Sequence, residues 1–304
     1  MEETNGLTEK SIIMIMPYFG RWPEWIDLFM ISCQWNPSVN WVFFTDCGIP
    51  ACAPENVLFY QMSFGDYRAL VSRRLKIQFP DTSPYKLCDY KPTYGCVHED
   101  VAAGFDYFGF GDIDVIYGNI RRFYTPEILR SNLISTHANR LSGHFCLIRN
   151  TDCMRQAFRR VKGWQTYLED PEHRGFDEHR FRRIVLRHKK YPRFLRQISG
   201  WFDPYQRRTY FEEQYSTILS PMPWHDGSHD HPQEWLWRKG CLTNTQDRDR
   251  EFLYLHFMNW KSSRYLRKYR NEDAPWEGLD RIVHFDVHPD VDSWRMTRRG
   301  FHRS

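Results

Sequence analysis

The stretch Phe108-Gly109-Phe110-Gly111-Asp112-Ile113-Asp114-Val115 joins an apolar run to two carboxylates that are two residues apart. The run Tyr107–Gly111 predicts a strand, and residues two apart in a strand point to the same face. If the strand ends near Asp112, both carboxylates can converge on one hard cation at the carboxyl edge of a sheet, where open α/β sheets bind ligands. A polar loop after a strand is the simpler interpretation, because a bare Asp-x-Asp is common.

The segments that precede this stretch alternate between two kinds of pattern. The short apolar runs Ile12–Met16, Trp41–Thr45 and Val57–Gln61 predict strands that are buried on both faces. A helix is expected after Pro23, which suits the first helical turn, and another over Tyr67–Ile77. This alternation predicts an α/β fold with a largely parallel, Rossmann-type sheet and flanking helices.

The second half is less regular, and we expect it to form a smaller mixed region. The segment 220–233, rich in Pro, His and Gly, predicts a long surface loop. An irregular C-terminal tail is expected after Asn271. The expected strands are Asn132–Thr136, His144–Arg149, Glu234–Trp237 and Glu251–Met258, and the expected helices are Thr151–Val161 and Phe176–Lys190.

Composition excludes several classes of protein. With 304 residues, of which 41% are hydrophobic and 26% charged, the chain has the values of a globular protein. No run of about 18 apolar residues predicts a transmembrane helix, and the polar segment Met1–Lys10 does not predict a secretory signal. The eight cysteines form no CxxC pair and no zinc-site spacing, so we expect reduced thiols in a cytoplasmic protein.

Two further features of the composition point to a ligand. The aromatic share of 17% exceeds the need of a core and suggests a cleft lined by rings. Residues 149–208 carry 16 Lys and Arg against 7 Asp and Glu, whereas residues 1–148 are acidic. An acidic half next to a basic segment suits a polyanionic ligand that is held partly through a metal. Solvated helix faces are the alternative explanation of the basic segment.

The Asp-x-Asp stretch resembles the DxD motif of nucleotide-sugar-dependent glycosyltransferases of the GT-A fold, and further pieces occur in the order of that fold. Ile12–Tyr18 resembles its first strand, whose end meets the nucleotide. Phe43–Asp46 resembles the second strand, where a Thr-Asp pair approaches the base. Lys86–Pro92 lies where such enzymes place polar contacts to ribose, phosphate or sugar. The likeness covers roughly residues 11–261 and is nearest to a bacterial group of poorly characterised glycosyltransferases linked to surface polysaccharides such as capsule and lipopolysaccharide.

A late histidine and lysine extend the resemblance. Leu255–Lys261 is similar to the segment of glycogenin-like transferases in which a histidine supplies a third metal ligand and a basic residue contacts the diphosphate. The Gly and the Pro of that pattern are absent here. The resemblance implies Asp112, Asp114 and His256 as metal ligands and Lys261 as a phosphate contact, which suits the affinity of imidazole for manganese. A buried histidine in an apolar strand is the alternative.

Two more segments resemble parts of such enzymes. Phe176–His179 is similar to the His-Asp-Glu segment of blood-group-type retaining galactosyltransferases, which implies Asp177 and Glu178 as catalytic carboxylates beside the sugars. The start of a helix, where the dipole favours acidic residues, explains the pair equally well. Gly143 resembles the glycine that packs under the donor sugar, and His144 would face donor or acceptor. A strand entered through a glycine turn is the alternative there.

The resemblance therefore implies a metal-dependent glycosyltransferase of the hexosyltransferase type. It would use Mn²⁺ or Mg²⁺ and a nucleoside diphosphate sugar, with a UDP-sugar as our expectation, and act on a glycan or glycolipid hydroxyl. A non-catalytic carbohydrate-binding module and a metal-dependent phosphohydrolase remain open alternatives. The expected contacts to the nucleotide sugar are Pro17, Tyr18, Thr45, Asp46, Lys86, Asp89, Lys91, Asp112, Ile113, Gly143, His144 and Lys261.

The resemblance also implies how the chain is organised. Residues 1–10 would be a flexible N-terminus, and residues 11–270 a single GT-A-like catalytic domain. Residues 11–118 would form its nucleotide-binding half and residues 119–270 its acceptor half, followed by the tail 271–304. The basic stretch Lys261–Arg270 could contact the inner membrane surface, where lipid-linked acceptors reside, although a solvated helix face explains it as well. No nucleic acid partner is expected.

Overall fold

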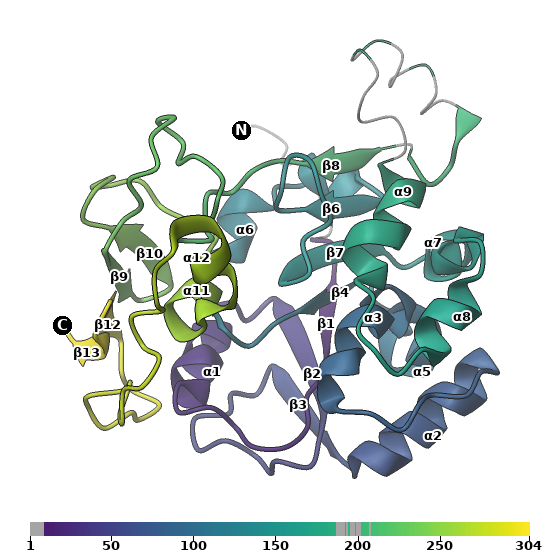
Figure 1. Cartoon of the computed structure of the whole chain (residues 1–304), viewed down its shortest axis with the longest axis horizontal. Coiled ribbons are helices and arrows are strands. Elements are labelled where there is room, and N and C mark those ends of the chain that lie inside the picture. Colours follow the sequence, from purple (N-terminus) through teal and green to yellow (C-terminus); the bar gives the residue numbers. More distant parts are fainter. Residues whose placement is uncertain (1–8, 187–191, 193, 195–197, 199–201, 207) are drawn as a thin grey trace, which may run out of the picture.

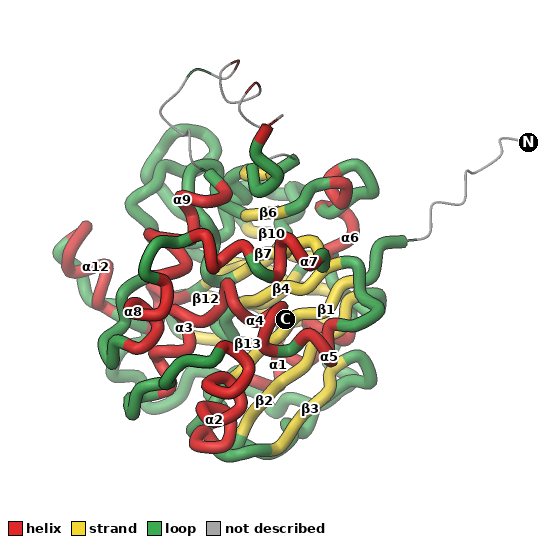
Figure 2. The backbone as a smooth tube through the Cα atoms, turned by 90° about the vertical axis from the view of Figure 1, so that its right-hand side faces the viewer, coloured by secondary structure: helices red, strands yellow, loops and turns green. Residues whose placement is uncertain are grey.

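The expected strands assemble into a central sheet in a computed structural model that describes residues 9–186, 192, 194, 198, 202–206 and 208–304. Among these residues the sheet has seven strands in the order β3-β2-β1-β4-β7-β6-β8, and only β7 runs against the others. Figure 2 shows most of this order from bottom to top. The predicted α/β fold with a largely parallel sheet is confirmed. The strands are β1 (Ile12–Pro17), β2 (Val39–Thr45), β3 (Val57–Gln61), β4 (Tyr107–Gly111), β6 (Leu133–Ser135), β7 (Phe145–Arg149) and β8 (Thr209–Phe211).

Both faces of this sheet are buried, which explains its continuous apolar runs. In β1, Met14 and Met16 belong to one core, and Ile13 and Ile15 belong to the core on the opposite face. Helices lie on both sides of the strands (Figure 1). One side carries α1 (Ile26–Gln34) and α6 (Ile120–Phe123). The other side carries α2 (Phe64–Leu75), α3 (Leu87–Tyr90), α4 (Tyr94–Val97), α5 (Glu99–Ala102), α7 (Asp152–Arg155), α8 (Trp164–Glu169) and α9 (Arg182–Val185).

The strand order creates a topological switch point at one edge of the sheet. Strand β1 pairs with β2 on one side and with β4 on the other, so the order of the parallel strands reverses between β1 and β4. The pairing Met14↔Gly109 brings the carboxyl ends of β1 and β4 to the same edge. Open α/β sheets bind ligands at such a switch point. Asp112 and Asp114 follow β4 at this edge, as the sequence predicts.

A two-stranded ladder brings a distant part of the chain to the same edge. Strand β5 (Val115–Tyr117) pairs antiparallel with β11 (Tyr254–His256), and His256 lies opposite Val115. The Phe257 N–H donates to the Asp114 carbonyl at 3.1 Å, and the His256 N–H donates to the Ser216 carbonyl at 2.8 Å. These backbone bonds fix His256 beside the Asp-x-Asp stretch. Only Tyr254–His256 of the expected strand 251–258 is a strand, and it is followed, after Phe257, by helix α11 (Met258–Lys261).

The prediction of an irregular C-terminal segment is wrong for its last part, since residues 293–303 form strands, whereas residues 271–292 carry no helix or strand. Strands β12 (Ser293–Thr297) and β13 (Gly300–Arg303) complete an antiparallel sheet of order β10-β9-β12-β13, and the rings of Trp237 and Trp294 stack 3.8 Å apart. The sequence signal was present, since Trp294 and Met296 alternate with polar residues at the strand period of two. The other strands of this sheet are β9 (Glu234–Arg238) and β10 (Cys241–Asn244), and helix α12 (Ser263–Arg270) follows α11.

Several predicted helices differ in extent. The predicted helix 67–77 begins at Phe64, because the Ser63 hydroxyl caps it by accepting from the Asp66 N–H at 3.1 Å. The predicted helix 151–161 is broken into α7 and a short 3₁₀ turn, η4 (Ala157–Arg160). The predicted helix 176–190 is a π-helical turn, η5 (Phe176–Phe181), followed by α9, and residues 187–190 lie outside the described residues. The remaining 3₁₀ turns are η1 (Pro84–Lys86), η2 (Lys91–Thr93) and η3 (Ile128–Arg130).

Three smaller expectations concern the rest of the chain. The segment 220–233 carries no helix or strand, as predicted for a loop. All eight cysteines lie in the described part of the chain, and none of them forms a disulfide there. No described helix combines the length and the apolar character that crossing a membrane requires. Of the N-terminus expected to be flexible, residues 1–8 fall outside the described residues.

Candidate functional site

Asp112, Asp114 and His256 meet at the carboxyl edge of the sheet. Each offers one ligand atom, and these atoms lie within 4.8 Å of one another. The two carboxylates come from the turn after β4, and the imidazole comes from the end of β11. The structure thus brings together the three residues that the resemblance implied as metal ligands.

The imidazole of His256 lies between Thr217 and Asp114. Its Nδ1 lies 3.1 Å from Thr217 Oγ1, and its Nε2 lies 3.6 Å from Asp114 Oδ1. Although Nε2 is buried, it has no hydrogen-bond partner among the described residues. Buried polar atoms are usually satisfied, so this nitrogen is available to bind a cation together with the Asp114 carboxylate. Two carboxylates and one imidazole nitrogen form a donor set that fits Mn²⁺ well and accommodates Mg²⁺.

Two lysines pair with the two carboxylates. Lys91 Nζ lies 2.5 Å from Asp112 Oδ1 and 2.9 Å from the Gly143 carbonyl, and Lys261 Nζ lies 3.0 Å from Asp114 Oδ2. Burial alone would raise the pKa of Asp114, but the charges of Lys261 and His256 hold that pKa well below its usual range. Burial would likewise lower the pKa of Lys91, yet Asp112 raises it above the usual lysine value. Asp114 and Lys91 therefore both carry their charges at neutral pH.

The acidic pair of η5, Asp177 and Glu178, lies close to Gly143 and Lys91. A Cβ on Gly143 would lie 3.3 Å from Asp177 Oδ2, 3.4 Å from Glu178 Oε1 and 3.8 Å from Lys91 Nζ. Asp177 is buried, and its Oδ1 has no hydrogen-bond partner within the described residues. Burial, with the nearby Glu178 charge, raises the pKa of Asp177 to about 7. A carboxyl group with that pKa can exchange a proton near neutral pH.

Lys86 and Asp89 are engaged elsewhere. Lys86 Nζ donates to Asp89 Oδ2 at 2.8 Å and to the Tyr167 and Glu172 carbonyls at 2.9 and 2.8 Å. Asp89 also accepts from the Phe176 N–H at 2.7 Å, which anchors the start of η5. Burial opposes ionisation of Asp89, but His173 and Lys86 lower its pKa to about 2. These bonds favour a positioning role for the buried pair over the direct ligand contact that the resemblance implied.

Four of the residues predicted to contact a nucleotide lie at the ends of β1 and β2. Pro17 ends β1, and the following Tyr18 ring stacks on Trp22 with centroids 5.0 Å apart. Asp46 Oδ1 accepts from the Gly20 N–H at 2.8 Å, which ties the two loops together. Thr45 is buried, so its side chain is less available to a nucleotide than those of Tyr18 and Asp46.

Ile113 and His144 support their neighbours. The Ile113 carbonyl accepts from Trp25 Nε1 at 2.9 Å, which fixes the turn between the two aspartates. The His144 ring stacks on His256 with centroids 3.9 Å apart, and its Nε2 lies 2.6 Å from the Tyr254 hydroxyl. Burial, reinforced by the charge of His256, keeps the pKa of His144 well below its usual value. A neutral, stacked His144 orients His256, whereas the sequence had suggested that it faces a sugar.

Two residues around the histidines were missed by sequence reasoning. Tyr254 donates to Thr136 Oγ1 at 2.7 Å and so completes the support of His144. Its spacing of two residues from His256 on one strand was a usable signal, because such residues share a face. Thr217 was not predictable, since a loop 39 residues away in sequence delivers it to His256.

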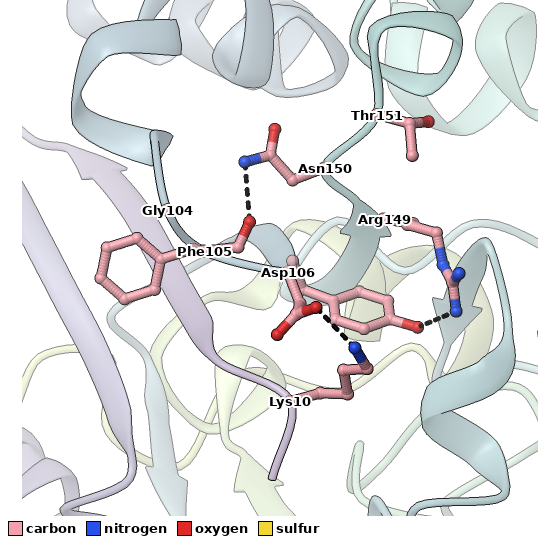
Figure 3. Close-up of a pocket in the computed structure, with 8 residues that line it drawn as sticks. Lys10, Gly104, Phe105, Asp106, Arg149, Asn150 and Thr151 are labelled. Atoms are coloured by element: carbon pink, nitrogen blue, oxygen red, sulfur yellow. Dashed lines mark hydrogen bonds and ion pairs between the residues drawn. The ribbon is translucent and has the colours of Figure 1, made fainter. Parts of the chain in front are cut away.

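A hollow lies at the opposite edge of the sheet, away from the carboxylate cluster. It has a volume of about 330 Å³ and lies beside the amino ends of β1 and β4. Figure 3 shows Lys10 turned toward Asp106 and Asn150 bonded to the Phe105 carbonyl. The Arg149 guanidinium donates to the carbonyls of Leu129 and Arg130. Most of its polar groups bond neighbouring residues, although the buried Nε of Arg149 has no hydrogen-bond partner among the described residues. The hollow lies at the edge opposite the cluster of Asp112, Asp114 and His256, so we place the candidate site at that cluster.

Comparisons with known proteins give low similarity to solved structures. The chain is similar to the galactosyltransferase LgtC in complex with donor and acceptor sugar analogs, with 10% identity, 88% and 90% of the two chains covered and a TM-score of 0.40. An active-site mutant of LgtC is similar with 7% identity, 88% of this chain and 90% of that chain covered, and a TM-score of 0.39. The glycosyltransferase GlyE of Streptococcus pneumoniae TIGR4 is similar with 10% identity, 68% of this chain and 46% of that chain covered, and a TM-score of 0.29. No curated protein matches the sequence. A family model matches residues 14–277, and the chain therefore belongs to the family of unknown function DUF6625.

Proposed function

We propose that this protein is a metal-dependent glycosyltransferase that moves a sugar from a nucleoside diphosphate sugar to a hydroxyl of a glycan or glycolipid. The observation that carries the proposal is the cluster of Asp112, Asp114 and His256, with Lys261 beside it, at the switch point of the sheet. A diphosphate needs positive charge on its oxygens, and this cluster offers a metal site and an ammonium together.

The residues around the diphosphate would have separate roles in binding the metal and the phosphate oxygens. Asp112, Asp114 and His256 would hold Mn²⁺ or Mg²⁺, which when bound offsets charge on the departing diphosphate. Lys261 would bind the phosphate oxygens directly. On the nucleotide side, Tyr18 and Asp46 lie at the ends of β1 and β2. We propose a uridine nucleotide, on the strength of the family resemblance, with the Tyr18 ring as a contact.

The sugar would lie over Gly143. The absence of a side chain there lets a ring approach Lys91, Asp177 and Glu178, which converge on that position. Lys91 and the buried Asp177 would orient sugar hydroxyls by hydrogen bonds. Glu178 is exposed and would face the acceptor. Asp177 and Glu178 are our proposed catalytic carboxylates, and the raised pKa of Asp177 supports a role in proton transfer.

The site favours transfer over phosphate hydrolysis. Within the described part of the chain, the groups that could hold a metal form one three-residue cluster. Many metal-dependent phosphohydrolases use two metal ions a few ångströms apart, which requires more ligands. A non-catalytic sugar-binding module has no need for a buried carboxylate with a pKa near 7. Both alternatives are therefore less well supported by this geometry.

The organisation of the chain follows from the same proposal. Residues 11–118 would form the nucleotide-binding half and residues 119–270 the acceptor half of one catalytic domain. We propose that the protein acts in the cytoplasm on surface-polysaccharide precursors. The basic helix α12 would then face lipid-linked acceptors at the inner side of the membrane.

Slow hydrolysis of the donor tests the function before any acceptor is known. The protein is incubated with a panel of nucleotide sugars in Mn²⁺, Mg²⁺ or EDTA, and the products are identified by mass spectrometry. We expect one UDP-sugar to yield UDP and free sugar only when metal is present. Release of UMP and sugar 1-phosphate would instead identify a phosphohydrolase. Absence of turnover with every donor, in protein that is folded and binds Mn²⁺, would contradict the transferase.

A further inference from the structure

The two lysines of the site differ in how firmly they are held. The Lys91 side chain is 7% exposed and has two partners, Asp112 and the Gly143 carbonyl. The Lys261 side chain is 35% exposed, and within the described residues its ammonium pairs with Asp114 alone. Lys91 is therefore a fixed part of the site, whereas Lys261 has freedom to change partners.

The surroundings of Lys261 allow such a change. It is the last residue of α11 and is followed by extended backbone at Ser262, so its flexible stem starts at a helix end. While it pairs with Asp114, its Nζ also lies 5.9 Å from the centre of the Trp25 ring, a weak cation–π contact that leaves the ammonium beside an aromatic face. Trp25 itself is held by its bond to the Ile113 carbonyl. Movement of the Lys261 side chain would therefore break its contacts with Asp114 and Trp25 and leave the Trp25 anchor in place.

The ion pair also opposes a metal ion at the same carboxylate. With Lys91 on Asp112 and Lys261 on Asp114, each predicted metal-ligand carboxylate already has one positive partner. A divalent cation bound by Asp114 would sit close to the Lys261 ammonium, and repulsion at such distances is strong in a partly buried site. A diphosphate that attracts the ammonium would remove this repulsion.

We propose that Lys261 is a switchable counter-ion, which pairs with Asp114 until a diphosphate takes over its ammonium, so that metal and nucleotide bind cooperatively through this side chain. The inference rests on the proposed function and adds a regulation of binding order to it. Because such coupling is reciprocal, the nucleotide raises metal affinity by the same factor by which the metal raises nucleotide affinity. A metal ion alone then binds weakly, and the complete donor complex binds tightly.

Titration of Mn²⁺ tests this inference without any turnover. Free Mn²⁺ is followed by electron paramagnetic resonance at pH 8, with and without UDP, for the wild-type chain and for Lys261→Met. We expect UDP to raise Mn²⁺ affinity of the wild type about tenfold or more. In Lys261→Met, Mn²⁺ alone should bind about 5- to 30-fold more tightly than in the wild type, and the effect of UDP should shrink accordingly.

Three further variants make the result specific. Lys261→Arg keeps the charge and should retain the coupling. Lys261→Gln keeps a hydrogen-bond donor for Asp114 and should behave like Lys261→Met, which covers a folding defect of the latter. Lys239→Met removes an exposed lysine that lies 3.5 Å from Asp292, and it should leave Mn²⁺ binding unchanged. An effect of Lys239→Met as large as that of Lys261→Met would overturn the inference.

The outcomes separate the switch from the proposed function. If Lys261→Met and Lys261→Gln fold but bind Mn²⁺ no more tightly than the wild type, the switch is wrong. The transferase still stands in that case, provided that the wild type hydrolyses a nucleotide sugar. If the coupling shrinks as expected and no donor is hydrolysed, the switch holds for a nucleotide-binding site and the transferase is wrong.

Discussion

The two ends of strand β4 carry aspartates with opposite surroundings. Asp106 immediately precedes the strand and accepts hydrogen bonds from Lys10, the Ser11 N–H and the Ser11 hydroxyl. Asp114 follows the strand, is buried, and faces His256, whose Nε2 has no partner among the described residues. The first end is a structural junction, whereas the second gathers carboxylates, an imidazole and an ammonium at the carboxyl edge of the sheet.

This difference shows which observation identifies a site. The hollow at the Asp106 end has a volume of about 330 Å³, and most of its polar groups bond neighbouring residues (Figure 3), Arg149 Nε being the exception among the described residues. At the Asp114 end, the informative atoms are His256 Nε2 and Asp177 Oδ1, both buried without a partner in the described structure. Because buried polar atoms are normally satisfied, these two say more about ligand binding than the size of a hollow does.

The largest effect is expected from Asp114→Asn. It removes a buried charge that faces both the metal position and Lys261, so metal-dependent hydrolysis of the donor should fall by about 10²- to 10³-fold. Hydrolysis rates at saturating Mn²⁺ measure the loss, and thermal unfolding verifies that the variant is folded. Undiminished hydrolysis in a folded variant would remove Asp114 from the site.

Asp177→Asn should change how stability depends on pH. Between about pH 4 and pH 7 the folded protein retains a proton on Asp177 that the unfolded chain releases, because the pKa rises from 3.8 to about 7 on folding. The free energy of unfolding should therefore fall as pH rises through this window, by on the order of 4 kcal/mol from this group. Asn does not titrate, so the variant should lack this decline.

Urea unfolding at pH 5 and pH 8 measures the effect of Asp177→Asn. The wild type should lose stability relative to the variant at the higher pH. Glu178→Gln serves as a control for the coupled neighbour, since it should lower the pKa of Asp177 and weaken the decline without abolishing it. Parallel pH profiles of the wild type and Asp177→Asn would show that Asp177 is not a carboxyl group with a raised pKa.

Thr217→Val should weaken metal binding without touching a ligand. The Thr217 hydroxyl lies 3.1 Å from His256 Nδ1 and thereby directs Nε2 toward Asp114. Loss of such a supporting bond costs about 10- to 100-fold in metal affinity. Mn²⁺ titration measures the change, and Thr217→Ser, which keeps the hydroxyl, should restore the affinity. Equal affinity in Thr217→Val and the wild type would exclude this positioning role.

The smallest functional effect is expected from Asp106→Asn, the same substitution at the other end of β4. It weakens the bonds from Lys10 and Ser11, so the protein should lose about 1 kcal/mol of stability. Mn²⁺ binding and donor hydrolysis should not change. A loss of activity comparable to that of Asp114→Asn would break the contrast between the two ends of the strand.

The parts of the fold that could be predicted are those with a strong local pattern. The strands Ile12–Met16 and Val57–Gln61 were predicted within one residue of the observed bounds, because a strand buried on both faces is a short apolar run between turns. The C-terminal strand Ser293–Thr297 shows the expected alternation but was missed, although it forms a local hairpin with β13 in addition to its distant pairing with β9. Local patterns show that a strand can form, not what it pairs with.

The site was predictable to the extent that its residues belong to motifs. Asp112 and Asp114 stand out by spacing, and the resemblance supplied His256. Thr217 could not be found, because it reaches His256 only through tertiary packing. Conversely, Lys86 resembled a ligand contact, although it is bonded to Asp89 and two carbonyls. A charged residue in a sequence does not reveal whether the fold already provides its partner.

The most direct test of the account is calorimetric titration of UDP into the full chain, with Mn²⁺ and with EDTA. The account predicts that UDP binds in Mn²⁺ and that EDTA abolishes or strongly weakens this binding, because the diphosphate is recognised through the metal held at Asp112, Asp114 and His256. Equal binding in both conditions, or no binding of any nucleoside diphosphate in Mn²⁺, would contradict the assignment of this edge as a metal-dependent nucleotide site.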